Sequence, residues 1–138
     1  MGRLLAIDYG KKRTGLAATD PMKLIASPLE AVDTEKLWSF LKQYVPDEKV
    51  EAIIVGVPTD HKGEDTDITA ECRKLMRELE TFFPDVEVFS MDESFTSKMA
   101  RESMVASGAK KKKRSVKKNV DKVSAALILQ SFMEYKNY

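Results

Sequence analysis

The sequence predicts an α/β domain with a mixed five-stranded sheet and helices on both faces, in the order βββαβαβαα. Two observations indicate this class. Three strand-like segments with short connections open the chain, at residues 3–8, 14–20 and 24–32, which favours an antiparallel meander. Two more apolar segments, at residues 52–58 and 86–91, alternate with helical patterns, as is typical of strand–helix–strand units with parallel pairing.

Length and composition bound the class of protein further. At 138 residues, without a repeat or an internal linker, the chain (residues 1–138) is expected to be one domain that buries a real core. It has no run of about 18 apolar residues, so no membrane span is expected. The amino terminus becomes acidic too soon for a signal peptide, and a single cysteine cannot form an internal disulfide. Both observations favour the cytoplasm.

Each element has a local justification. Pro28 has no N–H to donate and therefore suits an edge strand. Thr34 can cap a helix that runs to the Pro46 turn. The unbroken apolar run at residues 52–58 is typical of a central strand that is covered on both faces. Apolar residues at helical spacing predict the remaining helices, over about residues 68–82, 96–108 and 120–135.

Positive charge is concentrated near the end of the chain. The net charge is only +1, but residues 1–106 hold 14 Lys and Arg against 20 Asp and Glu, whereas residues 107–138 hold 9 against 2. Seven basic residues that we expect in a loop account for most of this difference. They favour contact with a polyanion, although a solvated loop without a specific partner is the alternative. These residues are Lys110, Lys111, Lys112, Lys113, Arg114, Lys117 and Lys118.

Three acidic positions fall where this architecture could bring them together. Asp8 ends the first strand and precedes a basic, glycine-containing turn, and Asp92 and Glu93 end the fifth strand. Parallel strands gather their carboxyl ends at one edge of a sheet. Asp121 falls on the apolar stripe of the last helix, where its charge needs a cation, a helix-terminus dipole or a metal. Capping that helix is an alternative use for it. Oxygen ligands from separate elements favour Mg²⁺ or Mn²⁺ over zinc.

Other chemistry is poorly supported. His61 is the only histidine and lies in a hydrophilic segment, so neither a His-based triad nor a multi-histidine metal site is available. Cys72 lies on an apolar helical stripe and is expected in the core. Gly10 and Gly15 permit a tight turn that lets backbone N–H groups approach a phosphate. Gly56 lets a backbone or a ligand come close at the end of the central strand.

Four segments resemble, in order, the motifs of the YqgF/RuvX family of Holliday-junction-resolvase-like bacterial proteins. They are residues 6–17, 54–58, 92–97 and 120–130, and together they span nearly the whole chain. The resemblance implies an RNase H-like fold and a cytoplasmic nuclease that matures the 5′ end of pre-16S ribosomal RNA. Holliday junction resolution is an older assignment for the same family.

The resemblance also assigns roles to individual residues. It implies that Asp8, Glu93 and Asp121 are the metal-binding acids, with the adjacent Asp92 able to exchange roles with Glu93. One departure is Ser94, which stands where the family usually has an arginine. The residues implied to line the nucleic-acid side are Lys12, Arg13 and Thr96.

Three functions remain open on these observations. The first is a metal-dependent endonuclease that acts on structured RNA. The second is resolution of branched, four-way DNA by the same acids, which would require a dimer. The third is a non-catalytic RNA-binding protein of ribosome assembly, which Ser94 slightly favours. An actin-like ATPase would need two such domains. We therefore expect a nucleic-acid partner, no membrane, and a monomer or weak homodimer.

Overall fold

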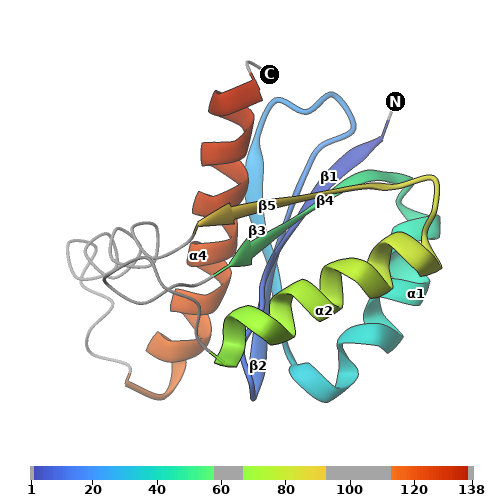
Figure 1. Ribbon diagram of the computed structural model, residues 1–138. Helices are drawn as coiled ribbons and strands as arrows, with labels where there is room; N and C mark the ends of the chain where they lie inside the picture. Colours follow the sequence, from blue (N-terminus) through green and yellow to red (C-terminus); the bar gives the residue numbers. More distant parts are fainter. Residues whose placement is uncertain (1, 58–66, 93–112, 137–138) are drawn as a thin grey trace.

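Five strands form one mixed sheet in the computed structural model, in the order β3-β2-β1-β4-β5 (Figure 1). The structure describes residues 2–57, 67–92 and 113–136, and for residues 67, 92 and 113–122 it describes the backbone only. The pairs β1–β2 and β2–β3 are antiparallel, whereas β1–β4 and β4–β5 are parallel. The predicted mixed sheet is therefore confirmed. The strands are β1 (Arg3–Asp8), β2 (Arg13–Thr19), β3 (Ala26–Asp33), β4 (Val50–Val57) and β5 (Glu87–Asp92).

The edge position predicted from Pro28 is confirmed, because β3 is the first strand of the sheet. Pro28 pairs with Ala17, next to a register shift between Leu16 and Ala17. An edge strand has a hydrogen-bonded neighbour on one side only, so the donor that proline lacks interrupts no second ladder. The register shift keeps the rest of the β2–β3 pairing intact around it.

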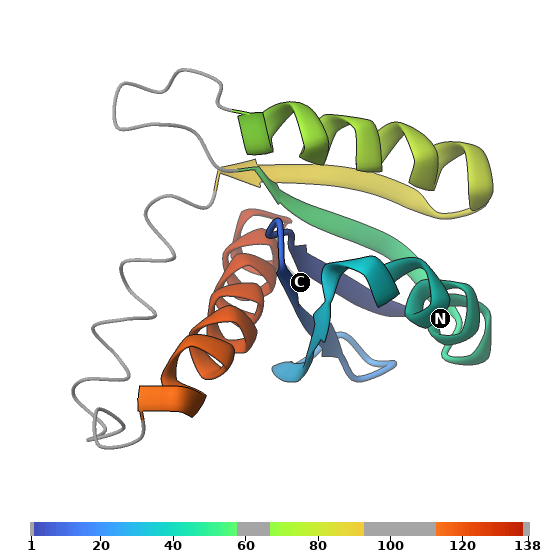
Figure 2. The same cartoon turned by 90° about the horizontal axis from the view of Figure 1, so that it is seen from below.

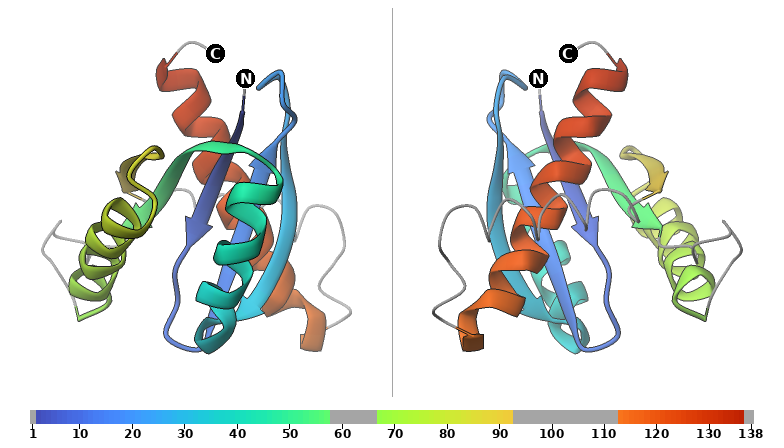
Figure 3. Two further views of the ribbon diagram at one scale, coloured as in Figure 1. Left: turned by 90° about the vertical axis from the view of Figure 1, so that its right-hand side faces the viewer. Right: turned by 90° about the vertical axis from the view of Figure 1, so that its left-hand side faces the viewer.

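Helices cover both faces of the sheet, as predicted. The two panels of Figure 3 show α1 and α2 in front of the strands from one side and α4 in front of them from the other. Figure 2 shows α2 and α4 on opposite sides of β4 and β5. No helix in the described part of the chain is both long enough and apolar enough to cross a membrane. The helices are a 3₁₀ turn η1 (Thr34–Lys36), α1 (Leu37–Asp47), α2 (Asp67–Phe82) and α4 (Lys113–Lys136).

Strand β1 is buried on both faces and divides two hydrophobic cores. Leu5 and Ile7 face α1 and α2, whereas Leu4 and Ala6 face α4, and all four are fully buried. Burying a leucine or isoleucine side chain contributes about 1.5–3 kcal/mol. β1 is therefore held firmly from both sides, which fixes the position of the residue at its carboxyl end. The helix residues that meet β1 in these cores include Leu41, Leu79, Ala125, Ile128 and Leu129.

The last helix begins earlier than the sequence pattern predicts. It starts at Lys113 rather than near residue 120, so the expectation that residues 113–118 lie in a loop is wrong. Lysine and arginine are good helix formers, and neither glycine nor proline occurs between residues 113 and 136. The helix predicted over residues 96–108 lies outside the described part of the chain.

Candidate functional site

Asp8 is half-buried at the carboxyl end of β1. Side chains alternate along a strand, so Asp8 lies on the same face as Leu4 and Ala6, the face that α4 covers. Its directly paired neighbours are Gly15 on β2 and Gly56 on β4. Paired side chains on one face normally lie about 4.5–5.5 Å apart. Because both neighbours are glycines, neither places a side chain beside the Asp8 carboxylate.

The parallel strands end level with one another at this edge. Asp8 pairs with Gly56, and Gly56 pairs with Met91, so β1 and β5 end on either side of β4. Asp92, the last residue of β5, pairs with Val57. Neighbouring strands are about 4.8 Å apart, so the ends of β1 and β5 are separated by about 10 Å of backbone. Met91 is therefore the β5 residue level with Asp8, and it packs in the same core as Leu4 and Ala6.

The central strand is anchored from beneath at the same edge. Cys72 of α2 is fully buried, which confirms the prediction that it belongs to the core. Its Sγ donates to the carbonyl oxygen of Gly56 at 3.6 Å, a weak hydrogen bond of the kind that thiols make. The contact comes from the face opposite Asp8, so it adds nothing to the space beside the carboxylate.

Helix α4 brings residue 121 to the Asp8 face of the sheet. Residue 121 precedes the buried Ala125 by one helical turn, and Ala125 packs in the core that contains Leu4 and Ala6. Ser124 is buried on the same side of the helix. The backbone of Asp121 thus lies on the stripe of α4 that faces the sheet, as its spacing predicts.

The turn after Asp8 is held by a residue that the sequence analysis assigned otherwise. Thr34 was expected to cap a helix, but its hydroxyl donates to the carbonyl oxygen of Gly10 at 2.6 Å. Its backbone N–H donates to the carbonyl oxygen of Lys12 at 2.9 Å. The Thr34 hydroxyl has one proton, so the 2.9 Å contact with Thr14 uses the Thr14 hydroxyl as donor. No sequence signal distinguishes this role from capping.

The close packing of this turn explains why a glycine stands at position 10. A Cβ atom at this position would lie 2.3 Å from the backbone oxygen of Arg13, which real side chains do not tolerate. The close approach of residues 10 and 13 places Lys11 and Lys12, both exposed, directly after Asp8. Arg13 begins β2 and is half-buried. The basic turn predicted beside Asp8 is therefore present, and nucleic-acid contact by Lys12 and Arg13 remains a prediction.

The remaining predicted site residues are placed less completely. Among the side chains that the structure describes, no three Asp, Glu, His or Cys residues form a metal site. Those side chains do not include Asp92 or Asp121, of which only the backbone is described, nor Glu93. The basic residues Lys113, Arg114, Lys117 and Lys118 belong to the first turns of α4. The residues outside the described part are His61, Glu93, Ser94, Thr96, Lys110, Lys111 and Lys112.

The sheet order, the helices on both faces and the acid at the end of β1 define an RNase H-like α/β domain. Two solved structures share this fold over nearly the full chain. The RuvC of T. thermophilus in complex with a Holliday junction substrate matches with a TM-score of 0.58 and 16% identity, covering 97% of both chains. The Holliday junction resolvase of fowlpox virus matches with a TM-score of 0.57 and 11% identity, covering 97% and 99%.

The chain belongs to the RuvX family, which is described as Holliday junction resolvase and whose model matches residues 2–135. Curated relatives named "Putative pre-16S rRNA nuclease" align over the same length. The protein of Amoebophilus asiaticus is 49% identical over 139 residues, covering 100% of this chain and 99% of the relative. That of Flavobacterium johnsoniae is 42% identical over 138 residues, covering 100% of both. The resemblance read from the four motifs is confirmed.

Proposed function

We propose that residues 1–138 form one metal-dependent endonuclease domain that cuts precursor 16S rRNA near its 5′ end in the cytoplasm. Relatives that carry this activity in their names align with the whole chain. The structural observation that carries the proposal is Asp8, a half-buried acid at the end of a strand fixed from both faces, with a glycine on either side. A carboxylate held in place by a buried strand, with no side chain from either paired neighbour, is suited to positioning a cation.

The proposed metal ligands are Asp8, Glu93 and Asp121, with Asp92 able to replace Glu93. Carboxylate oxygens are the donors that Mg²⁺ and Mn²⁺ prefer. The described residues include no histidine, and Cys72 packs in the core on the opposite face from Asp8. When bound, such ions supply an activated water and stabilise the leaving oxygen. Asp8 would hold the ion in place, because its strand cannot shift without disturbing two cores.

Basic residues would hold the substrate around this centre. Lys12 and Arg13 follow Asp8 by four and five residues and lie at the same edge of the sheet. Thr96, Lys110, Lys111 and Lys112 are proposed to contact phosphates as well. The sequence of the first turns of α4 is basic, and we propose that these turns attract RNA in a salt-dependent manner. The helix residues in question are Lys113, Arg114, Lys117 and Lys118.

The test is the substitution Asp8→Asn, which keeps the shape of the side chain and removes its charge. We expect cleavage of a precursor 16S rRNA fragment in Mg²⁺ or Mn²⁺ to fall by at least about a hundredfold, since the ion loses a ligand. Calorimetric titration with Mn²⁺ should show weaker binding by a similar factor.

Asp85→Asn is the matched control, because Asp85 is exposed in the turn before β5, at the opposite end of that strand. It should cleave RNA and bind Mn²⁺ as the unsubstituted protein does. Undiminished cleavage and Mn²⁺ binding by Asp8→Asn would refute the assigned site. RNA binding without cleavage under any divalent ion would instead favour a non-catalytic assembly protein.

Cleavage of four-way DNA is the second candidate, because the family is described as Holliday junction resolvase. The chemistry at phosphorus is the same, so the acids do not separate the two substrates. A four-way DNA junction and a precursor rRNA fragment should be compared side by side at equal enzyme concentration. Paired cuts across a junction require a dimer, and a protein that sediments as a monomer while it cuts RNA would exclude this candidate.

A further inference from the structure

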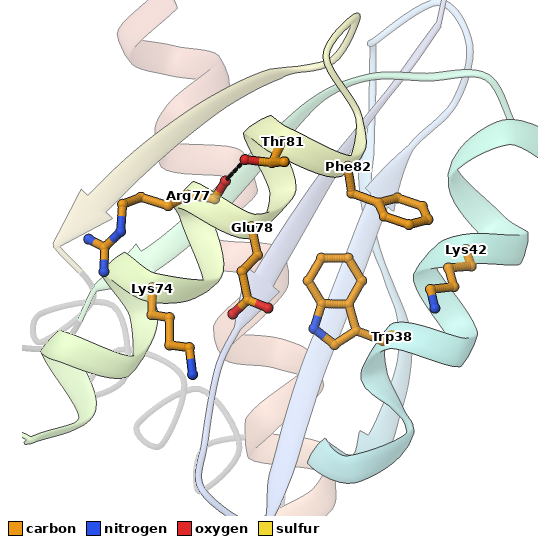
Figure 4. Close-up of a pocket in the computed structure, with 7 residues that line it drawn as sticks. All are labelled: Trp38, Lys42, Lys74, Arg77, Glu78, Thr81 and Phe82. Atoms are coloured by element: carbon orange, nitrogen blue, oxygen red, sulfur yellow. Dashed lines mark hydrogen bonds between the residues drawn. The ribbon is translucent and has the colours of Figure 1, made fainter.

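A second surface lies on the other face of the sheet, in a groove between α1 and α2 (Figure 4). Two adjoining hollows of about 490 and 430 Å³ form this groove, and they share Trp38, Lys74 and Glu78. Each is within the range of ligand pockets, about 300–1,000 Å³. None of the lining residues belongs to the proposed metal or phosphate sites. The α1–α2 groove is lined by Tyr9, Lys11, Trp38, Lys42, Glu71, Lys74, Arg77, Glu78 and Phe82, among others.

Aromatic rings form one wall of the α1–α2 groove. Trp38 of α1 is half-buried, and Phe83 stacks on it with ring centres 6.5 Å apart and planes within 16°. Phe82 meets Trp38 edge-on at 5.8 Å and is 52% exposed. The contacts with Phe82 and Phe83 hold the indole in one orientation. An exposed phenylalanine beside a fixed indole offers flat apolar surface to the solvent side of the groove.

Cations from three elements surround these rings. Lys42 of α1 lies over the Phe82 ring, with its Nζ 5.4 Å from the ring centre. Lys74 and Arg77 reach the groove from α2, and Lys11 from the turn after β1. Against these four cations stand Glu71 and Glu78, so the groove carries a net charge of +2. Residues 1–106, by contrast, carry 14 Lys and Arg against 20 Asp and Glu.

The groove leads to the carboxyl edge of the sheet. Tyr9 and Lys11 line one end of it, and they follow Asp8 by one and three residues in the chain. Tyr9 is half-buried, and its phenol supplies a hydroxyl donor at this end of the groove. A polynucleotide bound in the groove would therefore contact its aromatic rings, its lysines and the Tyr9 phenol, and would reach the turn beside Asp8.

We propose that the α1–α2 groove binds an unpaired segment of the RNA substrate. A base would stack on the Trp38 ring beside Phe82, and the flanking phosphates would contact Lys42, Lys74, Arg77 and Lys11. Proteins that bind single-stranded nucleic acid combine aromatic rings with cations in this way. Every unpaired base has a flat face that can stack on a ring, whereas in a duplex the faces of the bases are covered by their neighbours. The proposal rests on the proposed function only for the identity of the polynucleotide as substrate.

Trp38 is the only tryptophan in the chain, so its fluorescence reports directly on the groove. The full-length protein would be titrated in EDTA with an oligouridylate of about ten nucleotides, within the roughly 4–16 nucleotides that single-strand sites cover. We expect saturable quenching that weakens with salt. A duplex of equal length should leave the fluorescence unchanged. Equal quenching by the duplex or by heparin would overturn the proposal, since charge alone would then explain it.

Substitutions locate the contacts, with binding followed by the anisotropy of fluorescein-labelled RNA. Lys42→Gln with Lys74→Gln should weaken binding roughly tenfold and make the salt slope shallower by about 1.4, at about 0.7 per phosphate. The control pair Lys36→Gln with Lys136→Gln removes equal charge outside the groove and should have no such effect. Trp38→Ala should weaken binding about tenfold, and Trp38→Phe should restore most of it. If both pairs of lysine substitutions weaken RNA binding equally, the proposal that RNA binds in the groove is refuted.

The two proposals fail separately. Asp8→Asn should retain full quenching of Trp38, because the groove does not use the metal site. Quenching without cleavage by the unsubstituted protein would refute the nuclease proposal and leave the groove intact. Cleavage of RNA with no change in Trp38 fluorescence would refute the groove and leave the nuclease proposal intact.

Discussion

The position of the Asp8 carboxylate depends on neighbouring residues that carry no charge. Leu5 and Ile7 fix its strand from one side and Leu4 and Ala6 from the other, while Gly15 and Gly56 place no side chain beside it. From the sequence alone, these glycines are predicted only to let another part of the backbone or a ligand come close. Their alignment with Asp8 depends on how the strands of the sheet pair, so it could not be predicted before the pairing was known.

Gly10 tests how tightly the turn beside Asp8 is built. In Gly10→Ala, the added Cβ would meet the Arg13 oxygen at 2.3 Å, so the backbone must shift. We expect a loss of about 1–3 kcal/mol in the free energy of unfolding, as for other overpacked sites. Denaturant unfolding measures this loss.

The companion variant Lys11→Ala alters the same turn without adding bulk to the close contact. It should leave the stability within about 0.5 kcal/mol, as is usual for exposed positions. Equal stability of Gly10→Ala and the unsubstituted protein would show that the turn relaxes freely.

Elements were predictable where local patterns and tertiary packing agree. The edge position of β3 followed from Pro28, and the burial of β4 on both faces followed from its unbroken apolar run. The start of α4 could not be predicted from the sequence, because a run of lysines is compatible both with a solvated loop and with a helix. Thr34 was misassigned because a hydroxyl that could cap a helix found the Gly10 carbonyl instead, 24 residues away in the chain.

The connection between β2 and β3 has an element-scale test, because Asp20 organises it. The N–H groups of Ile25 and Leu24, both at 2.9 Å, and of Met22 at 3.1 Å donate to its carboxylate. The hydrogen bond from Ile25, helped by those from Leu24 and Met22, lowers the pKa of Asp20 against a smaller opposing effect of burial. The folded pKa is thus below the unfolded value of about 3.9. Its stabilisation is present above that value and is lost as the pH falls through the folded pKa.

We therefore expect Asp20→Asn to unfold at a lower temperature than the unsubstituted protein at pH 7. The difference in Tm should shrink at about pH 3, where the carboxyl group begins to take up its proton. Thermal unfolding followed by circular dichroism at both pH values measures it. Asp85→Asn, at an exposed position, should show no comparable change with pH. If the difference in Tm between Asp20→Asn and the unsubstituted protein is the same at both pH values, the charge of Asp20 does not contribute to stability.

At the scale of the whole molecule, the sheet separates two surfaces that the chain order conceals. One face carries Asp8 and α4, and the other carries the α1–α2 groove. Trp38 and Lys74 are 36 residues apart, on helices that each read as ordinary amphipathic segments, so no local pattern predicts their meeting. The meeting of the strand ends beside Asp8 was predictable because the ends of parallel strands gather at one edge of a sheet, whereas grooves between helices depend on side-chain packing.

Metal binding at the Asp8 edge should be visible in the stability of the whole protein. An ion that binds only the folded state stabilises it by about 2.7 kcal/mol at a hundred times its Kd. For a chain of 138 residues this corresponds to a rise in Tm of roughly 8 °C. Thermal unfolding in a series of Mn²⁺ concentrations, with EDTA as the reference, measures the rise.

The same series distinguishes the proposed ligands from surface carboxylates. Asp8→Asn should lose most of the rise in Tm, because the ligand on the most rigid strand is gone, whereas Asp85→Asn should keep it. Asp121→Asn would behave like Asp8→Asn if the stripe of α4 that faces the sheet contributes a ligand. A rise in Tm that survives Asp8→Asn unchanged would place the ion elsewhere. The Asp8 edge would then have to bind phosphate without a metal.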